Sequence, residues 1–134
     1  MNTKLTLPVV VAAAVLLVVR PALAHHAFSA EFDANKPINV TGTVTKIEWT
    51  NPHAWFYIDV KDASGKVTNW AFEMGAPNGL LREGWTRNSM KVGETVTVAG
   101  SRAKDGSAIA NAQTVTLKST GQRLFAASSR GQQQ

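Results

Sequence analysis

Histidine is the residue type in this chain that is best suited to metal chemistry. The chain contains three, His25, His26 and His53, and no cysteine. If the chain were cut after Ala24, His25 would carry a free α-amine. That amine, its own imidazole and the imidazole of His26 or His53 would offer several nitrogen ligands, and histidine is the commonest metal ligand in proteins. Such a set favours Cu(II) over other divalent ions. Two interpretations follow, a solvated pair of N-terminal histidines and a copper site.

The first 24 residues have the pattern of a secretory signal peptide. Lys4 supplies a positive charge, an apolar run extends over residues 9–19, and Ala22 and Ala24 form a small-residue cleavage signal. The apolar run is shorter than the roughly 20 residues that span a bilayer. We expect a periplasmic or secreted protein with no membrane anchor after signal cleavage.

Composition limits the remaining classes of function. Removal of residues 1–24 leaves a length that suits one domain, and the lack of cysteine excludes disulfides and thiolate metal sites. The whole chain has 14 Lys and Arg against 9 Asp and Glu, a net charge of +5, and the positive charges are scattered. An exported chain without a basic run is not expected to bind nucleic acid. The expected partner is a periplasmic ligand or protein whose identity these residues do not give.

The pattern of apolar residues after the signal peptide indicates an all-β domain. We predict an arm over residues 25–37, a domain over 38–118 and a largely disordered tail over 119–134, in which Leu124 and Phe125 dock. The domain should have five strands, with a short helix between the third and the fourth. The predicted strands begin at Ile38 and then cover His53–Lys61, Val67–Gly75, Thr95–Gly100 and Ile109–Leu117. This order is that of a small five-stranded OB-like barrel.

Two local features of the predicted domain can be tested directly. The apolar alternation changes phase near Lys46, which predicts a bulge in the first strand. In the short helix, Asn78 is the expected N-cap and Gly84 the expected end. That helix would place Leu81 and Trp85 together against the core.

The register of the second and third strands defines a candidate ligand-binding surface. Pairing Lys61 with Val67 gathers the apolar residues on one face. The other face then carries Trp55, Tyr57 and Glu73, on the surface that OB-folds commonly use for binding. Aromatic and acidic residues together suit a sugar, a peptide or a partner protein. The alternative is a surface that the arm or the tail covers.

The residues give little support to catalysis. The chain has no nucleophile motif and no Gly-rich phosphate loop. We predict no catalytic residue and no enzymatic activity, and a small copper oxidant is the alternative.

Four segments of the chain also carry a resemblance to a known family. They are His25–Phe28, Thr50–Trp55, Gly75–Leu80 and Gly100–Gly106. Through them the chain resembles a family of small exported bacterial proteins of unknown function. The resemblance implies export and a small β-barrel, and it implies no activity.

Our leading hypothesis is a periplasmic binding module of unknown ligand that binds copper at its mature N-terminus. The alternative is a protein- or glycan-interaction module that uses the Trp55/Tyr57 face and binds no metal.

Overall fold

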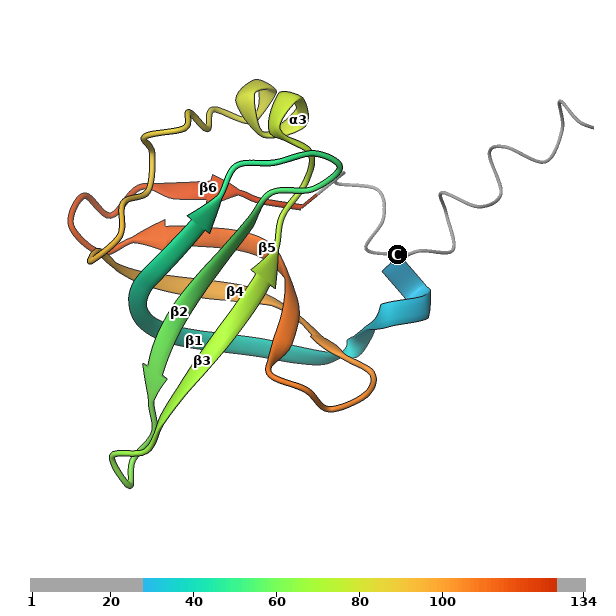
Figure 1. The fold of residues 1–134 in the computed structure, drawn as a ribbon, viewed down its shortest axis with the longest axis vertical. Helices are drawn as coiled ribbons and strands as arrows, with labels where there is room; N and C mark the ends of the chain where they lie inside the picture. The colour runs from blue at the N-terminus through green and yellow to red at the C-terminus, as the bar shows by residue number, and fades with distance from the viewer. Residues whose placement is uncertain (1–27, 128–134) are drawn as a thin grey trace, which may run out of the picture. The chain divides into compact units, whose positions relative to one another are not determined.

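The computed structural model describes residues 28–127, which form an all-β structure as predicted. The predicted signal peptide, His25, His26 and residues 128–134 lie outside the described residues. The chain divides into two units, Met1–Ala30 and Glu31–Gln134. Among residues 28–127, no helix has the length and apolar character needed to cross a membrane. The elements of the second unit are β1 (Phe32–Glu48), β2 (Trp55–Lys61), β3 (Val67–Glu73), α3 (Pro77–Arg82), β4 (Thr95–Ala103), β5 (Ile109–Leu117) and β6 (Arg123–Phe125) (Figure 1).

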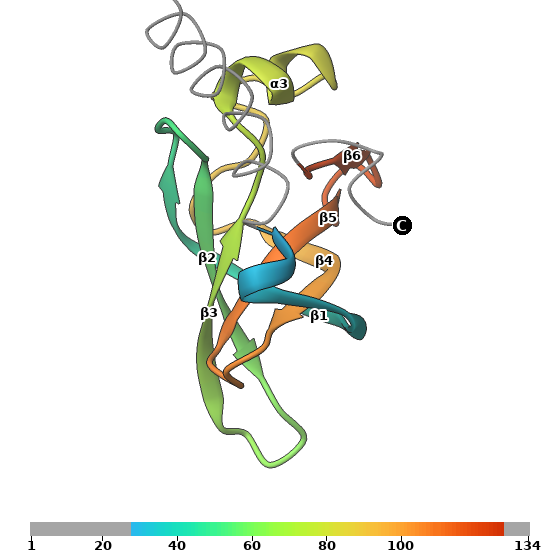
Figure 2. The same cartoon turned by 90° about the vertical axis from the view of Figure 1, so that its right-hand side faces the viewer.

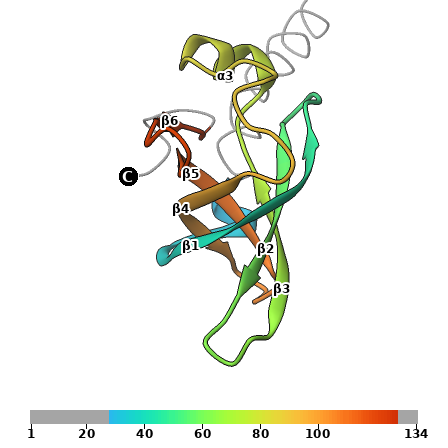
Figure 3. The same ribbon diagram turned by 90° about the vertical axis from the view of Figure 1, so that its left-hand side faces the viewer.

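The six strands form one sheet in the order β3-β2-β1-β4-β5-β6, with antiparallel neighbours. An additional parallel pairing joins β3 to β5, from Ala71 opposite Ile109 to Glu73 opposite Asn111, and Figure 2 shows these two strands side by side. The long strand β1 pairs with β4 along its first part and with β2 along its last part (Figure 3). Each strand from β1 to β5 therefore pairs with at least two others.

The predicted register of β2 and β3 is confirmed. Lys61 lies opposite Val67, Phe56 opposite Phe72, and Ile58 opposite Trp70. Phe56, Phe72 and Ile58 are buried, and the rings of Phe56 and Phe72 stack with their centroids 5.2 Å apart. The apolar set thus lies on the core face because side chains alternate between the two faces of a strand. The predicted bulge is confirmed as well, since the β1–β2 register shifts between Val44 and Lys46.

The sheet extends beyond both ends of the predicted 38–118 domain. β1 begins at Phe32, inside the predicted arm, because Phe32 pairs with Ala103 of β4 and is buried. A sixth strand, β6, lies inside the predicted tail and pairs with β5. Leu124 in β6 is buried, as expected of a docked residue, and the indole Nε1 of Trp85 donates a hydrogen bond to the carbonyl oxygen of Phe125 (2.9 Å). Pairing with β4, distant in the sequence, places the first segment in the sheet, and pairing with the preceding strand β5 places the second.

The prediction for the short helix is partly wrong. α3 begins at Pro77 and Ala76 is its N-cap, so Asn78 lies inside the helix. Trp85 is buried as predicted, but Leu81 is 51% exposed and Leu80 takes the core position. Leu81 and Trp85 do not share a helix face, because Trp85 lies beyond the end of α3. The helix ends before Gly84, whose φ of +95° turns the chain out of the helix.

Candidate functional site

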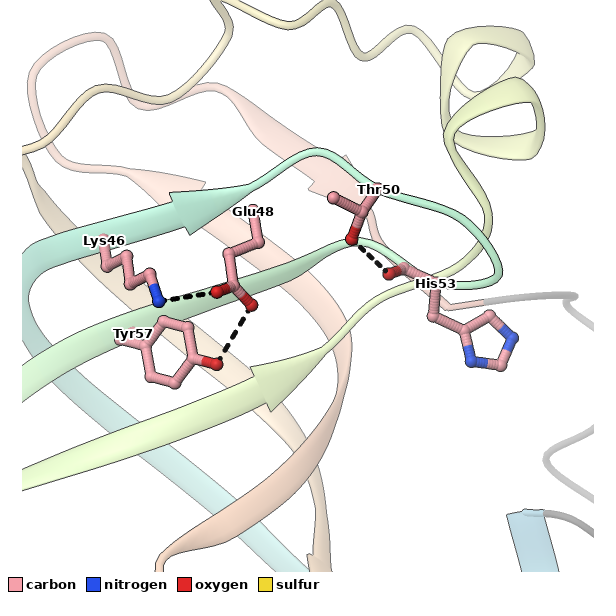
Figure 4. A network of polar contacts seen from close by, with 5 residues as sticks. All are labelled: Lys46, Glu48, Thr50, His53 and Tyr57. Carbon is pink, nitrogen blue, oxygen red and sulfur yellow. Dashed lines mark hydrogen bonds and ion pairs between the residues drawn. The ribbon is translucent and has the colours of Figure 1, made fainter.

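His53 lies in the loop between β1 and β2, two residues before β2 begins. Backbone bonds hold this point against the end of β3: the amide of Ala54 donates to the carbonyl oxygen of Gly75 (3.0 Å), and the amide of Met74 donates to that of Ala54 (2.8 Å). The hydroxyl of Thr50 donates to the carbonyl oxygen of His53 (3.4 Å), while the imidazole points away from this loop (Figure 4). The backbone is thus held, and the ring remains available for other contacts.

The imidazole of His53 contacts the carboxylate of Glu73. The distance from Nδ1 to Oε1 is 3.0 Å, and the side chains of His53 and Glu73 are 36% and 11% exposed, respectively. Glu73 is the last residue of β3, and its side chain lies on the face opposite to that of Phe72. Burial raises the pKa of the Glu73 carboxyl above its ordinary value. The charge of His53 opposes that pKa shift, and the nearby carboxylate of Glu31 adds to it.

The contact bears on which nitrogen of His53 is free for a ligand. When Nδ1 donates its proton to the carboxylate, a neutral imidazole keeps the lone pair of Nε2. Histidines that bind metals commonly donate their other ring N–H to a carboxylate in this way. The contact between His53 and Glu73 is similar to that arrangement.

Two further buried polar side chains lie in the same row as Glu73. Asn111 of β5 is opposite Glu73, and Ser101 of β4 is opposite Asn111. They are 4% and 1% exposed. The two strands approach closely here, because a Cβ at Gly100 would collide with the carbonyl oxygen of Asn111. Asn111 and Ser101 were not among the predicted site residues, because alternation in β4 and β5 predicts the face of a side chain and not its burial.

The outer face also carries a second, more exposed polar cluster around Tyr57 (Figure 4). The Tyr57 hydroxyl donates to Oε2 of Glu48 (3.1 Å), and Nζ of Lys46 lies 2.6 Å from Oε1 of Glu48 and 5.2 Å from the centre of the Tyr57 ring. The hydrogen bond from Lys46 holds the pKa of the Glu48 carboxyl below its ordinary value, and burial opposes that shift. This cluster was also missed. Its signal was available in the alternation that places Lys46 and Glu48 on one face of the strand.

Comparison with known proteins assigns the chain to a family. A family model described as a family of unknown function, DUF6152, matches residues 12–112. The chain belongs to the DUF6152 family. No curated protein matches it. Membership names neither a ligand nor a catalytic residue for this DUF6152 chain.

The structure unites some of the predicted site residues of this DUF6152 protein. Trp55 is opposite Glu73, and Tyr57 follows on the same face, as the predicted register requires. His53 joins them through Glu73. His25 and His26 lie outside the described residues. Within residues 28–127, no three His, Cys, Asp or Glu side chains are grouped so that they could hold a metal ion.

Proposed function

We propose that this DUF6152 protein is an exported, periplasmic binding module, and that its mature form binds Cu(II) through His53 and the histidines of its N-terminus. The observation that carries the proposal is the 3.0 Å contact between Nδ1 of His53 and the carboxylate of Glu73. With its proton on Nδ1, the partly exposed imidazole would keep the lone pair of Nε2 for a metal. A histidine oriented by a buried carboxylate is typical of metal sites.

The other ligands in this proposal come from the chain just before the described residues. Cleavage after Ala24 creates a free α-amine on His25, next to the imidazoles of His25 and His26. An amine with several imidazoles is a nitrogen-rich set that suits Cu(II). The α-amine, with an ordinary pKa of about 8, must lose its proton before it can bind, so copper affinity should rise with pH.

The strand order supports an OB-like barrel as the scaffold. The β3–β5 pairing joins the two ends of the five-strand series β3-β2-β1-β4-β5, and α3 lies between β3 and β4 in the sequence. OB-folds commonly bind their ligands on the face of strands two and three. The proposed site adjoins that face, because Glu73 is in β3 and His53 precedes β2.

The alternative, a protein- or glycan-interaction module on the Trp55/Tyr57 face, has less support. The Tyr57 hydroxyl already donates to Glu48, and the ammonium of Lys46 lies over the Tyr57 ring. Trp55 is half-buried. A platform for sugars or peptides needs exposed aromatic faces, so the present contacts favour the histidine site.

Export is tested by the mass of the protein recovered from the periplasm after expression with its natural N-terminus. The expected mass is that of a chain starting at His25, because Ala22 and Ala24 form the cleavage signal. Full-length protein confined to the cytoplasm would rule out both the signal peptide and the N-terminal amine ligand.

Copper binding is tested by calorimetric titration of mature, metal-free protein with Cu(II) near neutral pH. We expect about one ion per chain, given the number of nitrogen ligands. A variant with one extra Gly before His25 moves the amine and keeps every side chain, so its affinity should fall strongly. His53→Ala should also weaken binding, and Tyr57→Phe is the matched control that should not. Equal affinities in all four proteins would refute the site, and an effect of the extra Gly alone would remove His53 from it.

A further inference from the structure

We propose that Glu73 is a positioning residue that selects the tautomer of His53, with the proton on Nδ1 and the lone pair on Nε2. This inference rests on the proposed function, since it names the residue that prepares the ligand nitrogen. Unlike that function, it makes a claim about the metal-free protein. The two can therefore fail separately.

The position of the Glu73 backbone is well determined by its neighbours. Glu73 pairs with Trp55 of β2 on one side and with Asn111 of β5 on the other. The side chain of Glu73 therefore extends from a backbone position that is held by strands on both sides. His53 is held against the same end of β3 by the hydrogen bonds between Ala54, Met74 and Gly75. The 3.0 Å contact between Nδ1 and Oε1 thus joins two anchored residues.

Burial makes the position of the imidazole proton at this contact matter. Glu73 lies beside the buried Asn111, and Ser101, also buried, follows Asn111 in the same row. A buried carboxylate that lacks a hydrogen-bond donor is costly, so an N–H on Nδ1 is strongly favoured over a lone pair there. Among described residues, His53 is the side chain that forms an ion pair with Glu73. The carboxylate therefore selects the Nδ1–H tautomer.

The selected tautomer has a consequence for metal binding. A carboxylate that accepts the Nδ1 proton fixes the orientation of the ring and makes Nε2 a better electron donor. Loss of such an outer partner typically costs about 10- to 100-fold in metal affinity. We expect Glu73→Ala to lie in this range for Cu(II). Glu73→Gln should lose less, because its amide oxygen can still accept the proton.

The tautomer is measured by nitrogen-15 NMR of the histidine ring in mature, metal-free protein, at a pH where His53 is neutral. The wild type should show the proton on Nδ1 of His53, Glu73→Gln should largely keep it there, and Glu73→Ala should shift the population toward Nε2–H by at least tenfold. Glu48→Gln is the matched control, because Glu48 bonds Tyr57 and Lys46, and it should leave the spectrum of His53 unchanged.

Two outcomes would overturn the inference. One is wild-type His53 with its proton on Nε2, as would occur if a protonated Glu73 donated to Nδ1. The other is an unchanged tautomer in Glu73→Ala, with a folded-protein spectrum elsewhere. If Glu73→Ala fails to fold, the inference is still tested by the tautomers of His53 in the wild type and in Glu73→Gln. Absence of Cu(II) binding with the expected tautomers would refute the copper proposal and leave the role of Glu73 in the tautomer established.

Discussion

Two glutamates flank Trp55 on the outer face of the sheet, and they behave in opposite ways. Glu48 of β1 and Glu73 of β3 are both opposite Trp55 in the register of β2. The pKa of Glu48 is lowered, first by the hydrogen bond from Lys46, and the pKa of Glu73 is raised, first by burial. Two strand spacings, about 10 Å, separate these opposite environments.

The difference shows how partners and solvent compete. Glu48 has two polar partners, Lys46 and Tyr57, and remains partly exposed. Glu73 has His53 and lies in a buried row with Asn111 and Ser101. Water can replace a lost hydrogen-bond partner of an exposed carboxylate, whereas a buried carboxylate depends on the protein partner that it has. This dependence is why we place the candidate site at Glu73 and not at Glu48.

The largest effect is expected from a third carboxylate, placed on the inner face. Ile58→Asp would put a charge where exposure is 0%, with apolar neighbours such as Trp70 and Phe72. We expect a loss of about 3 kcal/mol or more in the free energy of unfolding, measured by urea denaturation. Tyr57→Asp, on the outer face, should cost much less. Equal losses would mean that burial does not separate the two faces as described.

A smaller loss is expected when Glu73 is deprived of its partner. His53→Ala leaves a buried carboxylate without its donor, which should cost about 1–3 kcal/mol at neutral pH. Tyr57→Phe removes a donor from Glu48, where water can replace it, and should leave the unfolding curve nearly unchanged. A larger effect of Tyr57→Phe than of His53→Ala would invert the comparison.

Carbon-13 NMR should show that the pKa values of the two carboxyls are shifted in opposite directions from the ordinary value of a glutamate. Because the pKa of Glu73 is raised, the folded state binds its proton first, and its contribution to stability improves as pH falls through the folded pKa. Because the pKa of Glu48 is lowered, its contribution is present above the ordinary pKa and is lost as pH falls through the folded pKa. Shifts of the same sign would contradict the assignment of causes.

The smallest effect is expected from added salt, which should change the pKa of Glu48 and not that of Glu73. At about 1 M salt the screening length is about 3 Å, so the exposed Lys46–Glu48 interaction weakens. The pKa of Glu48 should move toward its ordinary value in the same NMR titration. The raised pKa of Glu73 should persist, because burial is its first cause. Loss of the Glu73 shift in salt would show that the charge of Glu31 dominates.

Local pattern was sufficient to predict much of the sheet. The register of β2 against β3, the bulge near Lys46, and the bounds of β5 all follow from side chains that alternate with a period of two. A shift of one residue would have moved Phe56 and Ile58 out of the core. Because register and alternation are properties of neighbouring residues, the amino-acid order alone places Trp55, Tyr57 and Glu73 on one face.

The remaining features depend on pairing between strands, which the pattern within one segment does not show. Phe32 belongs to β1 because of Ala103, and Leu124 belongs to the sheet because of Val115. The contact between His53 and Glu73 forms because backbone bonds bring a loop to the end of β3. Alternation assigns a side chain to a face but does not say what covers that face. The sequence by itself thus determined which residues share the outer surface, and only the tertiary structure decided that Glu73 is buried there with His53 as its partner.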